Sequence, residues 1–328
     1  METPRSEGNE PGVPDSSTDA PLAAPLLEFL ARWQGRTASE QTPVPSLLFH
    51  YTDVSGLHGI LNTAQLWATH AAYLNDRTEL IHSIQLVQQL MEHRNGSSQL
   101  DGPLNCPADD VMLQVMQNLY RYLDIYTVCF CENGDLLSQW RAYGPQGGYA
   151  LGFAGGGVSV MVGPRITLVP VIYGEEEQRQ CLSDLVADWR ATFRDVPPRE
   201  SSPPVWGVGV LVFAEVFTLA AVAFKDAAFA EEREWRLVYR RLQLPDEGTG
   251  LQVAFRHRHG MLLPYVPITS LPHDRAESTP RLALEEITMG PRAEPQLAGY
   301  ALEKFVQGLG YTPSQPVIRP STVPLRSW

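Results

Sequence analysis

The sequence has few cysteines, and none of them form a pattern that builds a zinc site. Its four cysteines are Cys106, Cys129, Cys131 and Cys181. No two of them are separated by two residues, as in most structural zinc sites. Cys129 and Cys131 stand two apart in an apolar run, so on a strand they point the same way and do not pair. We therefore expect buried reduced thiols, no metal, and the reducing environment of the cytoplasm.

Positive charge is also scarce. The chain carries 25 Lys and Arg against 37 Asp and Glu, which gives a net charge of −12. Proteins that bind nucleic acid over a broad surface usually show the opposite bias, so we expect no such surface, although a local basic patch is compatible with this balance. Hydrophobic residues make up 44% of the chain and charged residues 19%, a composition that favours a packed core over global disorder.

The sequence lacks a secretory signal and a convincing membrane span. Residues 1–25 are rich in Pro, Ser, Gly and acids and have no basic segment followed by an apolar one, so we predict a disordered tail. Residues 205–224 are long and apolar enough for a bilayer, but Glu215 lies near their middle. A central acid costs roughly 2.5–3.5 kcal/mol on insertion. We predict a buried helix instead, with Glu215 at its edge or paired internally, and no membrane partner.

From residue 26 onward, short apolar runs and amphipathic stretches intermix without regular strand–helix–strand alternation. Strands are predicted at residues 46–51, 66–69, 125–130, 149–153, 166–173, 234–239, 251–255, 262–267, 287–289 and 316–318. Helices are predicted at residues 54–65, 80–93, 110–123, 136–143, 183–193, 205–224 and 293–309. We expect one α+β domain over residues 26–328, with a mixed, mainly antiparallel sheet and flanking helices.

A polar triplet, His50, Tyr51 and Thr52, ends the first predicted strand and precedes a helix. A histidine there can donate a hydrogen bond to a ligand hydroxyl, and helix-start amides can meet an anion. Taken alone, a satisfied strand-end histidine is the somewhat commoner outcome for such a residue.

Further candidates follow later strands. Tyr73, Asn75 and Asp76 come after the second strand, where Asn and Asp also suit a turn or helix cap. Trp140 and Tyr143 stand three apart on a predicted helix, so they can stack on a planar base, although core packing is the commoner outcome for such a pair.

The densest charge cluster lies at residues 231–236. On a strand, Glu232, Glu234 and Arg236 share one face, which is directed either to solvent or to a cleft. Two acids and an arginine directly before a buried strand are typical of a site at the end of a sheet. We expect these residues to form one polar site with those around His50.

Together these pieces resemble an uncharacterised, mainly bacterial family, domain of unknown function 2971 (DUF2971). The likeness is carried by FHYTDVSGLHGIL (49–61), YLNDRTE (73–79), TVCFCENGDLLSQWRAYGPQGGYALGF (127–153), FKDAAFAEEREWRLVY (224–239), EEITMGPRA (285–293) and a closing S-x-x-P-x-R (321–326). The blocks occur in the family's order, and the family name implies no activity.

A weaker resemblance links the chain to ADP-ribosyltransferases. The first block looks like their opening motif, and Glu232-x-Glu234 looks like their last motif. This resemblance implies NAD as a substrate, cleaved with transfer of ADP-ribose to an unknown acceptor, protein or nucleic acid. Glu234 would then stabilise the cationic ribose centre, and Glu232 would position or deprotonate the acceptor.

The same resemblance implies roles for the remaining candidates. His50 and Thr52 would bind ribose, and Tyr73 or Tyr143 would stack on nicotinamide. Two alternatives stay open: a non-catalytic ligand-binding or regulatory module of the same fold, and a different nucleotide-processing hydrolase that uses the same acids.

Overall fold

The computed structural model describes residues 26–33, 42–73, 77–92, 124–144, 147–159, 161, 165–192, 203–241, 251–258, 260–269, 281–292 and 294–324. The predicted tail at residues 1–25, the predicted helix at residues 110–123, and Asn75 and Asp76 lie outside these residues.

Ten strands in the described ranges form one sheet, which is mainly antiparallel as predicted. The strands are β1 (Leu47–Thr52), β2 (Gln65–His70), β3 (Asp124–Cys131), β4 (Tyr149–Ala154), β5 (Ile166–Pro170), β6 (Glu234–Arg241), β7 (Ala254–Arg258), β8 (Met261–Thr269), β9 (Leu284–Met289) and β10 (Val317–Pro320). The order is β10-β9-β4-β1-β3-β2-β8-β7, and β6 joins β3 to β5. Only β9 and β10 pair in parallel among these strands.

The sheet splits at β3, and this split positions the site. One edge of β3 pairs with β6 along its whole length. The other edge is shared, because β1 meets β3 at Cys131 and β2 meets it at Tyr126 and Thr127. The segment of β3 between these two contacts therefore borders a gap between two halves of the sheet.

Side chains of β3 alternate between two environments. Tyr126, Val128 and Phe130 enter the main core, which α2 (Val54–Thr63) and α10 (Pro295–Gly308) help to close. On the opposite face, Ile125 packs in a small apolar cluster with residues around the end of α9 (Pro203–Ala221). Thr127, Cys129 and Cys131 follow on this second face, beyond the cover that the helix provides.

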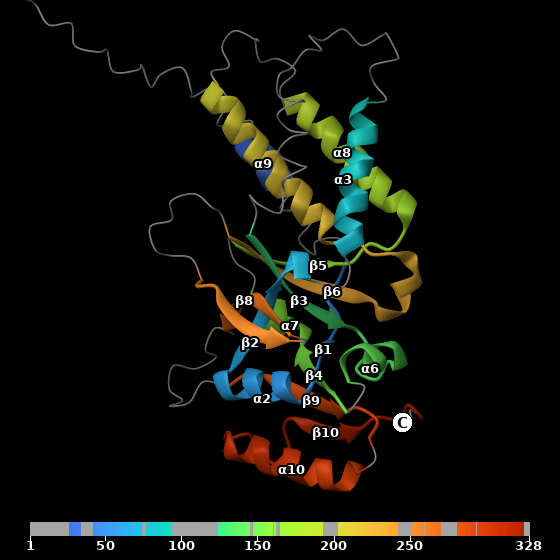
Figure 1. Ribbon diagram of the computed structural model, residues 1–328, viewed down its shortest axis with the longest axis vertical. Helices are drawn as coiled ribbons and strands as arrows, with labels where there is room; N and C mark the ends of the chain where they lie inside the picture. The colour runs from blue at the N-terminus through green and yellow to red at the C-terminus, as the bar shows by residue number, and fades with distance from the viewer. Residues whose placement is uncertain are drawn as a thin grey trace, which may run out of the picture.

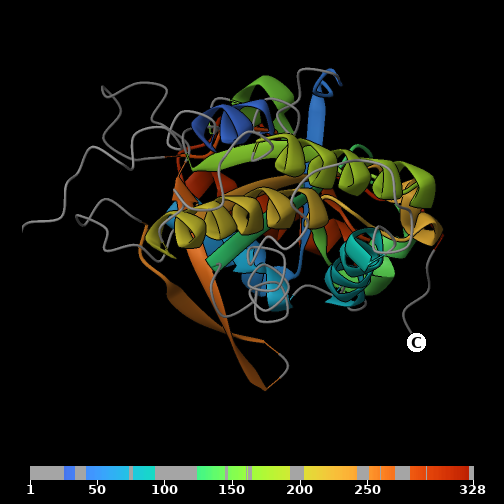
Figure 2. The same cartoon turned by 90° about the horizontal axis from the view of Figure 1, so that it is seen from above.

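Three long helices form a separate layer on the sheet. These are α3 (Arg77–Glu92), α8 (Glu175–Thr192) and α9, which lie together at one end of the molecule, with α10 at the other end (Figure 1). They share a second apolar cluster with the short helix at residues 26–33. Seen from above, the hairpin of β7 and β8 projects from the body (Figure 2).

Residues 205–221 of the apolar run lie in α9, as predicted, and the part of the helix from Phe213 to Ala221 is largely buried. Phe213 and Phe217 of α9 are fully buried. Glu215 pairs internally with Arg240 of β6, with 2.6 Å between Oε1 and Nη1. None of the helices in the described ranges is long and apolar enough to cross a membrane.

Several predicted element boundaries are wrong by three residues or more, and two of them have a clear physical reason. The helix predicted from residue 183 begins at Glu175, because Glu175, Glu176 and Glu177 favour a helix N-terminus through charge and not through apolar spacing. The strand predicted at residues 251–255 begins at Ala254, where pairing with β8 starts. Partner strands, which single-sequence patterns do not contain, decide where such short strands begin.

Candidate functional site

A cavity of about 470 Å³ opens at the split of the sheet. Its walls come from the end of β1, the start of α2, the outer faces of β2 and β3, helix α6 (Leu137–Tyr143), the 3₁₀ helix η3 (Ala227–Glu232) and the β7–β8 hairpin. The volume falls within the range of roughly 300–1,000 Å³ that small-molecule sites occupy. The polar lining residues include His50, Thr52, Thr69, Thr127, Gln139, Tyr143, Lys225, Glu232, Glu234 and Arg256.

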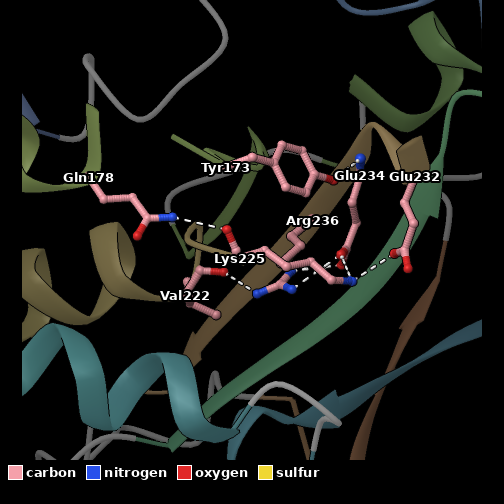
Figure 3. Close-up of polar contacts among 7 residues, drawn as sticks. All are labelled: Tyr173, Gln178, Val222, Lys225, Glu232, Glu234 and Arg236. Atoms are coloured by element: carbon pink, nitrogen blue, oxygen red, sulfur yellow. Dashed lines mark hydrogen bonds and ion pairs between the residues drawn. The ribbon is translucent and has the colours of Figure 1, made fainter. Parts of the chain in front are cut away.

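The centre of the site is a buried ion cluster (Figure 3). The ammonium of Lys225 lies 2.7 Å from Oε2 of Glu232 and 2.8 Å from Oε2 of Glu234. Arg236 donates from Nε to Oε1 of Glu234 at 2.7 Å and from Nη2 to its Oε2 at 3.2 Å. All four residues are at most 7% exposed, so each charge depends on its neighbours for compensation.

Glu234 is held by its backbone as well as by its side chain. Its N–H donates to the hydroxyl of Tyr173 at 2.8 Å, and its carbonyl accepts from Val171 N–H at 2.9 Å. Arg236 is anchored in turn, because its Nη1 donates to the carbonyl of Val222, just after α9. The carboxylate of Glu234 is therefore rigidly placed where β6 begins.

The cations keep Glu234 ionised. Burial alone raises the pKa of this carboxyl, but the charge and hydrogen bonds of Arg236, followed by Lys225, hold the pKa at about 2. Burial, followed by the charge of Glu234, raises the pKa of the neighbouring Cys129 thiol well above its ordinary value. Near neutral pH the site thus presents a fixed carboxylate beside an unreactive thiol.

Glu232 reaches this cluster by a different route from the predicted one. It ends the 3₁₀ helix η3, and β6 begins only at Glu234. Arg233 between them adopts a left-handed conformation, with φ of 41°. This turn, and not strand alternation, brings Glu232 to Lys225, so the prediction of one strand face holds for Glu234 and Arg236 only.

His50 closes the gap in the sheet. Its Nδ1 lies 2.9 Å from the carbonyl oxygen of Cys129 on the unpaired edge of β3. Because a carbonyl only accepts, Nδ1 carries the proton, and in the neutral ring Nε2 is an acceptor. The neutral imidazole can therefore accept a hydrogen bond from a ligand hydroxyl at Nε2, whereas the predicted donation to a ligand hydroxyl requires the protonated ring and stays a prediction.

The three aromatic residues that were predicted to contact a ligand differ in their position relative to the cavity. Tyr143 lines the cavity, where burial and the nearby charges of Cys129 and Glu234 raise the pKa of its phenol. Tyr73 also lines the cavity but is 46% exposed. Trp140 was expected at the ligand, yet it is fully buried, donates to Asp135 at 2.7 Å and does not line the cavity.

The groups at the end of β1 are largely committed to structure. The hydroxyl of Tyr51 donates to the carbonyl of Asn133 and accepts from Leu136 N–H, both at 2.9 Å. At the start of α2, Gly56 N–H donates to the Asp53 side chain at 2.7 Å. The Gly56 amide therefore already donates to an acceptor within the protein. It is not available for the predicted binding of an anion at the start of α2.

The structure thus brings together His50, Tyr51, Thr52, Tyr73, Tyr143, Glu232 and Glu234 around one cavity. Arg236 lies behind Glu234 and Trp140 in the core, while Asn75 and Asp76 fall outside the described residues.

Sequence reasoning missed Lys225, which binds both acids. The available signal was a lone lysine directly after a long apolar run. In the described part of the chain, no group of three or more His, Cys, Asp or Glu side chains is arranged to hold a metal ion.

Comparison with known proteins finds a family match for the segment that contains the ion cluster. No curated protein and no solved structure matches the chain. The predicted resemblance to DUF2971 is confirmed for residues 139–237, which match the model of this family, described as a protein of unknown function.

Proposed function

We propose that the chain is an ADP-ribosyltransferase-like enzyme that cleaves NAD in the cavity at the split of the sheet and transfers ADP-ribose to an acceptor. The observation that carries the proposal is the meeting of His50, Tyr143 and Glu234 around one cavity. These residues come from three segments far apart in the chain. A shared polar cavity with a strongly perturbed carboxyl is the usual mark of a ligand site.

The proposed reaction breaks the bond between ribose C1′ and the nicotinamide nitrogen. The bonding electron pair leaves with nicotinamide, which becomes neutral, and positive charge develops on the ribose. Glu234 stabilises this charge as a fixed carboxylate. The acceptor nucleophile then bonds to C1′ and gives its proton to Glu232, while His50 accepts a hydrogen bond from a ribose hydroxyl. Tyr143, which lies beside the acids, is a better candidate than Tyr73 for stacking on nicotinamide.

The split sheet also supports an ADP-ribosyltransferase-like fold as part of the proposal. In the proposed arrangement, NAD enters between β1 and β2, where β3 is left without a continuous neighbour. The ligand contacts then come from both halves of the sheet.

A non-catalytic ligand-binding module is the second candidate, and one observation favours it. Glu234 is 3% exposed and bound by both Lys225 and Arg236. The four charges of the cluster sum to zero, so the field that a ribose cation meets is weaker than that of a lone carboxylate. In this alternative, the cluster braces the cavity and the ligand leaves unchanged.

Isothermal titration with NAD, paired with an assay of nicotinamide release, separates the two candidates. Under the proposal, the wild type binds NAD and releases nicotinamide. His50→Ala weakens binding, and Glu234→Gln stops release, with a loss on the order of 10²–10³ in rate. Glu303→Gln, an exposed acid on α10, is the matched control and behaves as the wild type.

Each outcome decides between the candidates. Binding of NAD without release of nicotinamide identifies the module. If the wild type does not bind NAD at millimolar concentration, then the cavity is neither an NAD-cleaving site nor a site that binds NAD unchanged. Because Glu234→Gln breaks a buried network, Tyr143→Phe serves as a second variant, and it should weaken NAD binding only slightly if the ring stacks.

A further inference from the structure

Three polar atoms at the wall of the cavity are unsatisfied. Trp67 Nε1, Thr127 Oγ1 and Ser138 Oγ are shielded from solvent, and within the described ranges none has a hydrogen-bond partner. All three residues line the cavity. Buried polar groups in native proteins are nearly always bonded, so such a concentration of unsatisfied groups marks this wall of the cavity as a candidate ligand-binding surface.

Two of these atoms lie at the same end of the cavity. Thr127 of β3 pairs with Thr69 of β2, and Trp67 shares a strand face with Thr69. Arg256 of β7 donates from Nη2 to Thr69 Oγ1 at 2.6 Å, and its guanidinium lies 5.5 Å from the centre of the Trp67 ring. We call Trp67, Thr69, Thr127 and Arg256 the donor end of the cavity.

The functional groups of the donor end determine which kind of ligand group can bind there. An indole N–H and a guanidinium can only donate hydrogen bonds, and the guanidinium carries a positive charge. The threonine hydroxyl can donate as well, and rotation about χ1 exchanges the positions of its hydroxyl and methyl groups. The group that satisfies all of them is an acceptor with negative charge, which is an oxyanion.

The donor end is separated from the acids. Cys131 is the β3 residue that pairs with Glu234, and Thr127 lies four residues earlier on the same strand. At about 3.4 Å per residue, this places the two ends roughly 14 Å apart along β3. The cavity therefore carries donors with a positive charge at one end and carboxylates at the other, and it fits an extended ligand.

We infer that the donor end of the cavity is an oxyanion subsite, in which Trp67, Thr127 and Arg256 bind a phosphoryl or carboxylate group of the ligand. The inference rests on this end of the cavity and is independent of the proposed NAD cleavage at the acids. It holds equally for a ligand that is bound and not transformed.

The test measures the binding of inorganic pyrophosphate and of malonate. Isothermal titration gives the affinity, and thermal unfolding gives the shift in Tm. We expect at least one probe to bind the wild type and raise its Tm. Arg256→Gln and Trp67→Phe should each weaken binding about tenfold or more. Pyrophosphate alone identifies a phosphoryl subsite, malonate alone a carboxylate subsite, and both a general oxyanion subsite.

Thr127→Val is the sharpest variant, because it keeps the side-chain shape and removes an unsatisfied hydroxyl. It should weaken binding several-fold and leave the Tm of the ligand-free protein unchanged or higher. Thr218→Val on α9 and Arg319→Gln on β10 are controls that should bind the probes as the wild type does, since neither residue lines the cavity.

The inference is overturned if neither probe binds the wild type, or if Thr127→Val binds as the wild type does. It is also overturned if Thr127→Val lowers the ligand-free Tm more than Thr218→Val, since the hydroxyl would then have a structural partner. Glu234→Gln should bind the probe at least as tightly as the wild type. This variant separates failure of the subsite from failure of the proposed transfer reaction.

Discussion

At the scale of single residues, the cations around Glu234 decide its behaviour. Lys225 follows α9 and Arg236 lies within β6, so two elements supply the charges that a buried carboxylate needs. Removing a single partner from such a cluster leaves an uncompensated buried charge. This dependence makes the stability of the protein sensitive to pH.

Glu234→Gln should be destabilised relative to the wild type by roughly 3 kcal/mol near neutral pH, since a pKa of about 2 lies well below that of an unfolded glutamate. A depressed carboxyl pKa contributes stability that is fully present above about pH 5 and is lost as the pH falls towards 2. Urea unfolding of both proteins between pH 3 and 7 measures the effect. The difference should narrow at low pH, and a pH-independent difference would contradict this assignment.

At the scale of elements, the short helix α7 (Gly155–Ser159) is seated against the segment before β1. Gly155 N–H donates to the carbonyl of Ser46 at 2.9 Å. A Cβ at Gly155 would lie 1.8 Å from the carbonyl oxygen of Pro45. Because that atom belongs to the backbone, it cannot move aside as a flexible side chain can. The glycine is thus required by a close approach of two chain segments.

Gly155→Ala should therefore lower the free energy of unfolding by about 1–3 kcal/mol, the usual cost of overpacking. Gly157→Ala lies in the same helix, and its new Cβ meets nothing within 4 Å. It should be neutral or stabilising by up to about 1 kcal/mol, because alanine favours the helix. Thermal unfolding of the pair gives the comparison, and equal Tm values for the two variants would show that the segments do not pack as described.

At the scale of the whole molecule, the helical layer is joined to the sheet by a polar contact as well as by apolar packing. Glu215 of α9 and Arg240 of β6 form a largely buried ion pair. Burial raises the pKa of Glu215 despite the opposing charge of Arg240. A raised carboxyl pKa means that stability decreases as the pH rises above the unfolded value, so the ionised acid costs free energy in the fold.

A double-mutant cycle tests this contact. Glu215→Leu and Arg240→Met should each destabilise the protein by about 3–5 kcal/mol, because each removes one charge of the pair and leaves the opposite charge in a largely buried position. The combined variant Glu215→Leu/Arg240→Met should be close to the wild type or more stable, since it removes both desolvation costs. Chemical unfolding supplies the free energies, and additive losses in the double variant would show that the two side chains do not interact.

Local pattern was enough to predict several features of this protein. Short apolar runs placed β1, β2 and β3 within a residue or two of their observed bounds. The acid within residues 205–224 distinguished a buried helix from a membrane span, because an unpaired central charge is costly in a bilayer. Both signals are local, so one sequence contains them.

Only the tertiary structure decided how the site is assembled. Lys225 meets Glu232 and Glu234 because α9 ends above the start of β6, and no local rule relates these positions. Strand pairing determined which hydrogen-bond partner His50 has, and therefore which of its ring nitrogens can accept. Trp140 is buried in the core because Asp135 accepts a hydrogen bond from its indole N–H. The sequence by itself determined the types of most elements and which side chains were candidates for the site. The cavity depends on the place where β1 and β2 diverge along β3, and long-range strand pairing decides that place.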